Sequence, residues 1–493
     1  MLTSRSILEI DFVILAIRSA FKYQTLSLWQ SWFASTSSHT FEVNPGGLRV
    51  IFTEDPTNIR ALLTTQFNDY GKGERFRERW SEFLGSSIFT TDLAAWQASR
   101  ALLRPLFHKE RVADLHTFET HVLELLPLLA GPVSTNTTDM NTVHEVDVAD
   151  LFFRYTLDAA TSFLLGKSVG SLHNPQVQFA EAFADAQRLQ AILERSGQFR
   201  FLVPKSRFRQ AIKKLNDFVE PFIERALSLP QETLASSSEY TFLHALAGFT
   251  RDRTVLRDQL VAVLLAARDT TAATLSWTIY ELARHPQIVT KLRREVWDTV
   301  GSSKAPSYDD LKSMRYLQHV MSEVLRLYPA VPYNLRTALR DTTLPTGGGR
   351  DGKEKIGVLK DTPIAYSTLT MQRRPDLFPE FATEGVKGGD DKIADQPAQL
   401  PSVETFYPER WESWTPKAWT YIPFNGGPRI CIGQQFALTE MGYTLVRILQ
   451  RFEGVRPAKS AIGQEVKLKA DIVLQPAGPV MVEFFGGQAI SAE

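Results

Sequence analysis

Cysteine is almost absent from this chain of 493 residues, because Cys431 is its only example. A single cysteine excludes a disulfide within the chain and the paired cysteine spacings of zinc sites. Net charge is absent too, since 55 basic residues balance 55 acidic ones. The basic residues are dispersed, which argues against nucleic acid as a partner. We find no internal repeat and no convincing Gly-x-Gly-x-x-Gly dinucleotide motif.

The N-terminus lacks a long apolar run. Its most apolar stretch, residues 7–21, contains Glu9, Asp11 and Arg18, so it is too short and too charged to span a bilayer. Elsewhere, 43% hydrophobic and 22% charged residues indicate a large folded core. Residues 380–405 carry the run GGDD and two prolines, and we expect an exposed loop insertion there.

Helical periodicity dominates the chain. Residues 41–43 and 48–52 surround a Pro-Gly-Gly turn and predict a hairpin, followed by a helix that begins near Asp55 and Pro56. Residues 342–361 are a glycine-rich excursion flanked by short strands. Apolar residues recur at helical spacing over residues 179–193, 205–227, 254–285, 287–300 and 315–328. The pattern predicts a mainly α fold with small β-sheets (α+β).

Cys431 lies in the segment FNGGPRICIG, residues 424–433. A thiol binds metal as thiolate, which needs positive charge and hydrogen bonds around it. Arg429 supplies charge, while Gly427 and Gly433 let the backbone approach a flat ligand. Apolar residues at helical spacing from 438 to 452 place Cys431 just before a helix N-terminus, where free amides stabilise a negative sulfur. The alternative is a buried free cysteine that acts as a small apolar residue.

The segment resembles the haem-ligand signature of the cytochrome P450 family, Phe-x-x-Gly-x-Arg-x-Cys-x-Gly. Phe424, Gly427, Arg429, Cys431 and Gly433 fill its fixed positions. The resemblance implies a cytochrome P450 fold, a triangular helical prism around a buried haem b, with Cys431 as the axial ligand of the iron. The other landmarks quoted below run in order from residue 96 to 431, so we expect residues 41–493 to form a single catalytic domain.

A second landmark is the run EVLR, residues 323–326, which resembles the family's Glu-x-x-Arg motif. The later run YPERW, residues 407–411, resembles its Pro-Glu-Arg segment. Together they imply a buried structural triad of Glu323, Arg326 and Arg410, with Arg410 bidentate to Glu323. Taken alone, Glu323 and Arg326 are an ordinary surface ion pair.

A third landmark is AARDTT, residues 266–271, in the middle of the long apolar helix predicted over 254–285. Threonine in such a helix bonds backward to a carbonyl and loosens the turn. In the family this stretch lies over the distal face of the haem, which implies that Asp269 and Thr270 manage oxygen binding and proton delivery. Ala267 stands where glycine is commonest in the family. The alternative is a helix whose polar residues face solvent.

Trp96 and Arg100 are four residues apart, so a helix places them on one face. They resemble the family residues that hydrogen-bond a haem propionate, and an indole N–H and a guanidinium suit that carboxylate. The resemblance adds Arg429 and Arg336 as further propionate partners.

Several stretches are similar to the fungal group of the family that oxidises n-alkanes and fatty acids at the chain terminus. We therefore expect a haem-thiolate monooxygenase that inserts one oxygen atom of O2 into an apolar substrate, most simply by terminal (omega) hydroxylation. The alternative is a tailoring hydroxylase of a fungal secondary metabolite. Further alternatives are a reductase-independent isomerase or dehydratase and a non-catalytic haem-binding protein. The pocket candidates are Phe89, Leu264, Ala267, Val331 and Leu335.

The resemblance also implies partners and a location. The chain has no room for a flavin module, so electrons should come from NADPH through a separate cytochrome P450 reductase. We expect a monomer on the cytosolic face of the endoplasmic reticulum. Residues 1–40 would be a truncated membrane-proximal segment, and the aromatics of WQSWF, residues 29–33, would make peripheral membrane contact.

Overall fold

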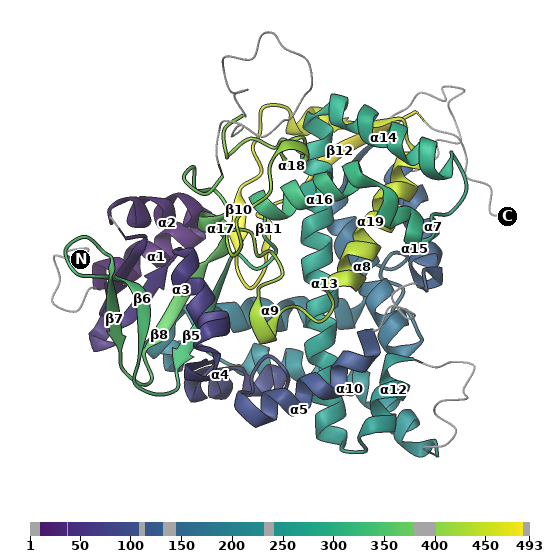
Figure 1. Cartoon of the computed structure of the whole chain (residues 1–493). Coiled ribbons are helices and arrows are strands. Elements are labelled where there is room, and N and C mark those ends of the chain that lie inside the picture. The colour runs from purple at the N-terminus through teal and green to yellow at the C-terminus, as the bar shows by residue number, and fades with distance from the viewer. Residues whose placement is uncertain are drawn as a thin grey trace, which may run out of the picture.

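The computed structural model of this chain describes residues 10–36, 38–107, 114–131, 144–230, 241–378 and 401–486. Helices dominate these residues, and small sheets lie toward one side (Figure 1). The predicted mainly α class with small sheets is confirmed. The principal helices are α1 (Ile10–Phe21), α2 (Thr25–Ala34), α3 (Pro56–Arg60), α4 (Glu74–Leu84), α5 (Leu93–Leu103), α7 (His116–Ala130), α8 (Val148–Leu165), α9 (Gln178–Arg195), α10 (Ser206–Ser228), α12 (Phe242–Phe249), α13 (Arg253–Arg284), α14 (Pro286–Val300), α15 (Tyr308–Ser313), α16 (Arg315–Leu327), α17 (Thr368–Met371), α18 (Arg410–Ser413) and α19 (Gln434–Arg451).

The largest sheet has the strand order β1-β2-β8-β5-β3 and joins the N-terminal hairpin to strands from the second half of the chain. The predicted hairpin is confirmed, with Phe41 opposite Phe52. The glycine-rich excursion is flanked by β5 and β8 as predicted, and it forms the β6–β7 hairpin itself. The strands are β1 (Thr40–Val43), β2 (Val50–Thr53), β3 (Tyr70–Gly71), β4 (Glu145–Asp147), β5 (Tyr333–Ala338), β6 (Thr342–Gly348), β7 (Glu354–Val358), β8 (Pro363–Ser367), β9 (Gly454–Pro457), β10 (Leu468–Ala470), β11 (Leu474–Pro476) and β12 (Met481–Phe485).

The long helix α13 runs through the helical part of the molecule and packs against α8, α16 and α19 (Figure 1). Asp252 caps its first turn by accepting hydrogen bonds from the amides of Thr254 and Val255, which leaves fewer donors unpaired at that end. Pro286 starts the next helix and ends this one. At 32 residues, α13 is about 48 Å long. It is buried almost all round, so it forms the spine against which the site is built.

Helices α1 and α2 pack on the hairpin of the largest sheet. Phe12 stacks on Trp32 at 4.4 Å between ring centroids, and Trp29 stacks on Tyr333 at 5.5 Å. The prediction that the aromatics of residues 29–33 face a membrane is wrong for Trp32 and Phe33, which are 7% and 1% exposed. They are buried because they cover the apolar face of the hairpin. Within the described residues, no helix is both long and apolar enough to cross a bilayer.

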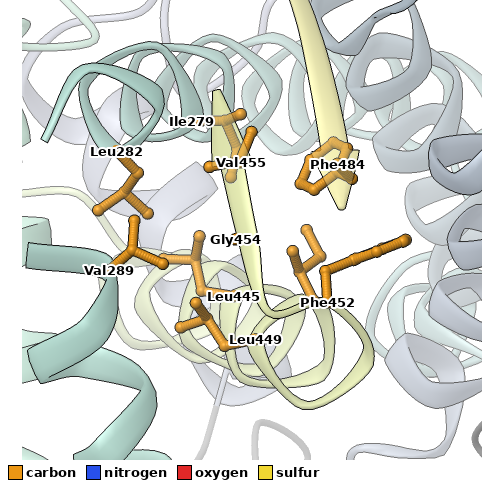
Figure 2. Close-up of a pocket in the computed structure, with 10 residues that line it drawn as sticks. Ile279, Leu282, Val289, Leu445, Leu449, Phe452, Gly454, Val455 and Phe484 are labelled. Atoms are coloured by element: carbon orange, nitrogen blue, oxygen red, sulfur yellow. The ribbon is translucent and has the colours of Figure 1, made fainter. Parts of the chain in front are cut away.

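A small cavity lies in the core between α13, α14, α19 and the sheet of β9 and β12 (Figure 2). Its volume is about 10 Å³, and side chains such as Ile279, Leu445 and Phe484 form its wall. A void of this size without polar partners holds no ordered water. It is a packing defect and not a site.

The loop insertion expected over residues 380–405 lies outside the described residues up to residue 400, and the description resumes at residue 401.

Candidate active site

A cavity of about 570 Å³ lies between α13, the loop that carries Cys431, and the largest sheet. This volume is in the range of cofactor and small-molecule sites. Apolar side chains form most of the wall, while Cys431 lies at one side and Thr270 on α13 also lines it. Cys431 is accessible from the cavity although the fold encloses it. A single space therefore joins the predicted thiolate ligand to the predicted oxygen-handling threonine.

The loop before Cys431 is held in place by the backbone. The amide of Cys431 donates to the carbonyl oxygen of Phe424 at 3.0 Å, and α19 begins three residues after the cysteine, as predicted. Gly427 has a φ of +68°, and a Cβ atom there would lie 1.9 Å from the carbonyl oxygen of Leu63. Only glycine allows both the left-handed conformation and this contact. An added Cβ at Gly433 meets no protein atom nearer than 3.7 Å.

Replacing Gly427 with alanine should prevent the loop from forming, because the new methyl group overlaps the Leu63 carbonyl. We expect loss of haem incorporation, measured as the ratio of Soret to protein absorbance. The matched control is Gly301→Ala, since Gly301 has a φ of +78° with no atom within 4 Å of an added Cβ. The Gly301→Ala control should lose only the stability that corresponds to backbone strain, about 1–2 kcal/mol. Equal loss in both variants would contradict the role of the clash.

Two groups favour the thiolate of Cys431. Burial raises the pKa of its thiol, whereas the backbone amide of Gly433 and the guanidinium of Arg100 act to lower it. The amide donor is the kind of hydrogen bond that the start of α19 was predicted to supply. The net pKa is raised in the protein alone. A bound cation at the sulfur supplies the missing positive charge and holds a coordinating thiol deprotonated.

The four residues predicted to bind propionates all line the cavity: Trp96, Arg100, Arg336 and Arg429. Arg100 donates to the carbonyl oxygen of Ile430 at 3.0 Å, and Arg336 donates to Leu335 O at 2.8 Å. Among the described residues, Nε of Arg429 is buried and has no hydrogen-bond partner, although its Nη2 donates to Thr91 O at 2.7 Å. Donors without partners at a cavity wall suit an anionic ligand.

The electrostatics of the arginines in this cluster also favour a negatively charged ligand. Burial, together with the neighbouring Arg336, lowers the pKa of Arg429 to about 10. Arg429 pairs with Asp92 at 2.6 Å and lies over the ring of Trp96 at 4.7 Å from its centroid. Crowded cations in a partly desolvated wall cost free energy that anions would offset.

These residues fit haem b. A thiol on one wall, glycine where a side chain would fill the space, and a cluster of cations at the cavity edge match a flat iron-bearing group with two carboxylates. A haem-thiolate protein is the class that this donor set defines.

The comparisons with known proteins agree. The profile of the family described as "Cytochrome P450" matches residues 14–380 and 392–484. The chain is 49% identical over 489 residues to "Cytochrome P450 monooxygenase pvhE" of Talaromyces variabilis, covering 97% of this chain and 88% of the relative. It is 39% identical to "Cytochrome P450 52A13" of Debaryomyces hansenii, covering 87% and 80%, and 40% identical to "Cytochrome P450 52A1" of Candida tropicalis, covering 83% and 74%. The chain belongs to the cytochrome P450 family.

The protein is therefore a monooxygenase with haem b as its cofactor, and it works with O2, a substrate and a redox partner that supplies electrons. Haem, when bound, would supply the oxidising chemistry, and Cys431 on the cavity wall is the residue that would hold its iron as a thiolate. The chain itself binds and orients substrate, excludes water and handles protons.

The polar run on α13 is divided between the cavity and the core. Thr270 lines the cavity, and its hydroxyl donates to the carbonyl oxygen of Ala266 at 2.7 Å, as predicted for a threonine in this helix. Asp269 does not line the cavity. It is buried beside Arg268, with Oδ1 3.4 Å from the guanidinium, and burial raises the pKa of its carboxyl. The alternative in which these polar residues face solvent is wrong.

The buried triad is present with a different geometry from the one predicted. Arg326, not Arg410, makes the bidentate pair with Glu323, with two contacts of 2.8 Å. Arg410 reaches Glu323 through one contact of 3.4 Å and donates to the carbonyl oxygens of Pro401 and Ser402. The fork of Arg326 aligns with the carboxylate because the two residues are three apart on α16. All three side chains are buried, so the surface-pair alternative is wrong.

Four of the five pocket candidates line the cavity: Phe89, Ala267, Val331 and Leu335. Leu264 is the exception, since it is 2% exposed and packs in the core. Its neighbours Val263, Leu265 and Ala267 on α13 do line the cavity, so helical spacing alone does not exclude Leu264. Sequence reasoning missed four charged residues of the wall: Lys72, Glu194, Arg195 and Asp471. No local periodicity marks them.

Proposed function

We propose that this protein hydroxylates the terminal carbon of an n-alkane or a fatty acid. The observation that carries the proposal is the wall of the cavity, which combines many aromatic and aliphatic side chains with Thr270. Aromatics such as Trp29, Phe52 and Phe76 come from α2, β2 and α4. A wall of this kind holds an alkyl chain by burial of apolar surface and excludes water. The stretches similar to the fungal alkane- and fatty-acid-oxidising group support the same substrate class.

A turnover panel tests this proposal. The haem-loaded protein, with a reductase and NADPH, is offered n-alkanes, fatty acids and polyketides of increasing length. We expect terminal alcohols from the alkyl substrates, identified by mass spectrometry, and slower or no oxidation of the polyketides. Hydroxylation confined to in-chain positions, or to the polyketides, would refute the terminal assignment.

Thr270 and Asp269 have separate roles in this proposal. The Thr270 hydroxyl faces the cavity and already donates to Ala266 O, so its lone pairs remain to accept a hydrogen bond from a cavity ligand. Asp269 lies behind it with a raised carboxyl pKa, because burial disfavours the charged form. A carboxyl with a raised pKa retains its proton to higher pH, which suits a residue that supplies protons to the cavity.

Replacing Thr270 with valine should separate electron use from product formation. The variant removes the hydroxyl with little change in volume, so we expect NADPH consumption to continue while more of it yields peroxide and less yields alcohol. The matched control is Thr278→Val, because Thr278 makes the same backward bond, 2.8 Å to Thr274 O, and does not line the cavity. The idea fails if both variants keep the wild-type ratio of alcohol to NADPH.

A second candidate function is tailoring of a fungal secondary metabolite. One observation favours it: the cavity wall also carries charged residues of both signs, among them Glu194, Arg195 and Asp471. Arg195 donates to the carbonyl oxygen of Ala470 at 2.7 Å, so polar groups are concentrated at this end. An oxygenated substrate could form hydrogen bonds with these polar groups, whereas an alkane would bury them without partners. Preferential oxidation of polyketides in the turnover panel supports this candidate.

We propose that NADPH-cytochrome P450 reductase is the electron donor, that the protein is a monomer, and that it lies on the cytosolic face of the endoplasmic reticulum. Exposed apolar side chains support peripheral membrane contact: Ile14, Leu15 and Phe21 of α1 and the pair Phe201 and Leu202. Burial of such side chains at a lipid interface is favourable. Flotation with phospholipid vesicles tests this, and protein that stays at the bottom of the gradient argues against it.

A further inference from the structure

Trp29 is an aromatic residue of the cavity wall that belongs to none of the haem-binding motifs. The sequence predicts membrane contact for residues 29–33, whereas the structure places Trp29 among the residues that line the cavity. Its side chain is only partly exposed. The N-terminal helix α2 is therefore part of the site, and the role of its tryptophan there follows from its position and its contacts.

Trp29 lies at the end of the cavity away from the thiol. Helix α2 is on the side of the small sheets, whereas α13 and α19 lie in the helical part of the molecule (Figure 1). Thr270 belongs to α13, and Cys431 lies three residues before α19. Helix α2 packs instead against α17 and β10. The cavity therefore extends from a reactive end at Cys431 and Thr270 to an end wall that includes Trp29.

Three aromatic neighbours hold the indole of Trp29 in place. It stacks on Tyr333 at 5.5 Å between ring centroids, with 30° between the ring planes. It also makes edge contacts with Phe52 at 5.3 Å and with Phe33 at 6.1 Å. Stacked and edge-to-face rings attract one another beyond the burial of their area. The indole is therefore a fixed part of the wall.

The segments around Trp29 are also tied together by hydrogen bonds. The hydroxyl of Tyr333 donates to the carbonyl oxygen of Asp471 at 3.0 Å, which joins β5 to the turn between β10 and β11. The side-chain amide of Gln30 donates to Glu404 at 3.0 Å, which joins α2 to the segment before α18. Tyr333 and Asp471 line the cavity as well. Remote segments thus form the end wall, and α2 is held against them.

A fixed end wall limits the length of an extended substrate. An alkyl chain whose terminal carbon lies at the reactive end extends from there toward Trp29. Each further methylene that becomes buried raises the affinity about fourfold, until the chain meets the indole. A longer chain must then bend or leave part of its length outside the cavity, so the gain in affinity with length stops.

We propose that Trp29 determines the longest alkyl chain that this site accepts. The inference rests on the proposed function and deepens it, because it assigns selection of chain length to the N-terminal helix α2. Loss of the indole extends the far end of the cavity. The reactive end is unchanged, since Cys431, Thr270 and the residues that would bind the propionates come from other elements.

The test titrates the haem-loaded protein with saturated fatty acids from octanoate to docosanoate and follows the Soret shift. In the wild type, affinity should rise with chain length and then stop rising. In Trp29→Ala the rise should continue for about two to four more carbon atoms, because the indole occupies the apolar area of several methylenes. Trp29→Leu should give a smaller extension, and Trp29→Phe, which keeps a ring beside Tyr333, should keep the wild-type limit. The matched control is Trp32→Ala on the same helix, since Trp32 is 7% exposed, stacks on Phe12 at 4.4 Å and does not line the cavity.

Three results would overturn the inference. An unchanged limit in both Trp29→Ala and Trp29→Leu means that other residues close the far end. Equal shifts in Trp29→Ala and Trp32→Ala mean that the packing of α2, and not the indole, sets the limit. An equal loss of affinity at every length, or loss of haem from both Trp29 variants, gives Trp29 a structural role only.

Failure of the proposed function has a different signature. If the wild type, fully loaded with haem, binds no alkyl ligand of any length, both proposals are overturned. If the limit shifts in Trp29→Ala as expected while oxidation occurs away from the chain terminus, the terminal assignment fails and the inference about Trp29 is supported.

Discussion

Replacing Cys431 with serine should abolish the red-shifted Soret band of the reduced carbon monoxide complex and reduce turnover to background. The physical reason is that a serine hydroxyl is not ionised near neutral pH, so it cannot supply the negative charge that a thiolate gives to haem iron. Cys431 is the only cysteine of the chain, so no other thiol can replace it. The measurement is a reduced, carbon monoxide-bound spectrum with a parallel assay of product.

The serine variant also separates haem binding from haem ligation. Arg100, Arg336 and Arg429 are unchanged in it, so we expect the variant to retain part of its haem through the propionates. A variant with haem and no red-shifted band supports Cys431 as the ligand. A red-shifted band that survives in the serine variant would show that another group binds the iron.

Replacing Arg326 with methionine should destabilise the protein by about 3–5 kcal/mol. The variant leaves Glu323 buried and without its bidentate partner. The single Arg410 contact of 3.4 Å and the indole of Trp411, which donates to Glu323 at 3.0 Å, cannot replace two contacts of 2.8 Å. The measurement is the temperature at which half of the red-shifted carbon monoxide band is lost.

The chain offers a control with the same spacing for this variant. Arg188 and Asp185 form an ion pair three residues apart on α9, with side chains 54% and 52% exposed. Removing an exposed pair changes stability by about 0–1 kcal/mol, so Arg188→Met should shift the midpoint little. Equal shifts in the two variants would mean that burial of the Glu323–Arg326 pair does not determine its contribution.

Much of the fold was predictable because helices follow from local pattern. The helix predicted over residues 254–285 agrees with α13 within one residue at each end, and the same reasoning placed α16 and α19. The loop of Cys431 was predictable for another reason: Gly427 and the cysteine lie within five residues, so the motif can be found without knowledge of distant segments. The close approach of Leu63 O to Gly427 was not predictable, because it comes from a remote part of the chain.

Partner choice between distant segments was less predictable. Arg326 and Arg410 both suit Glu323 by charge. Arg326 makes the bidentate pair because it lies three residues away on α16, and the packing of the segment before α18 leaves Arg410 with one contact of 3.4 Å. Trp32 and Phe33 are aromatic residues that would also suit a membrane interface, and the hairpin of β1 and β2 buries them instead. In each case the residue type allows two environments, and packing selects one.

The sequence by itself determined the family and the helical class, and it singled out Cys431 as the candidate iron ligand, because these depend on residues at short, fixed spacing. Tertiary structure alone decided which side chains share the cavity. Lys72 and Asn334 are 262 residues apart and meet at 2.9 Å, and Arg195 of α9 reaches the backbone of Ala470. No local pattern encodes such contacts, since they arise when burial of apolar surface brings remote segments together.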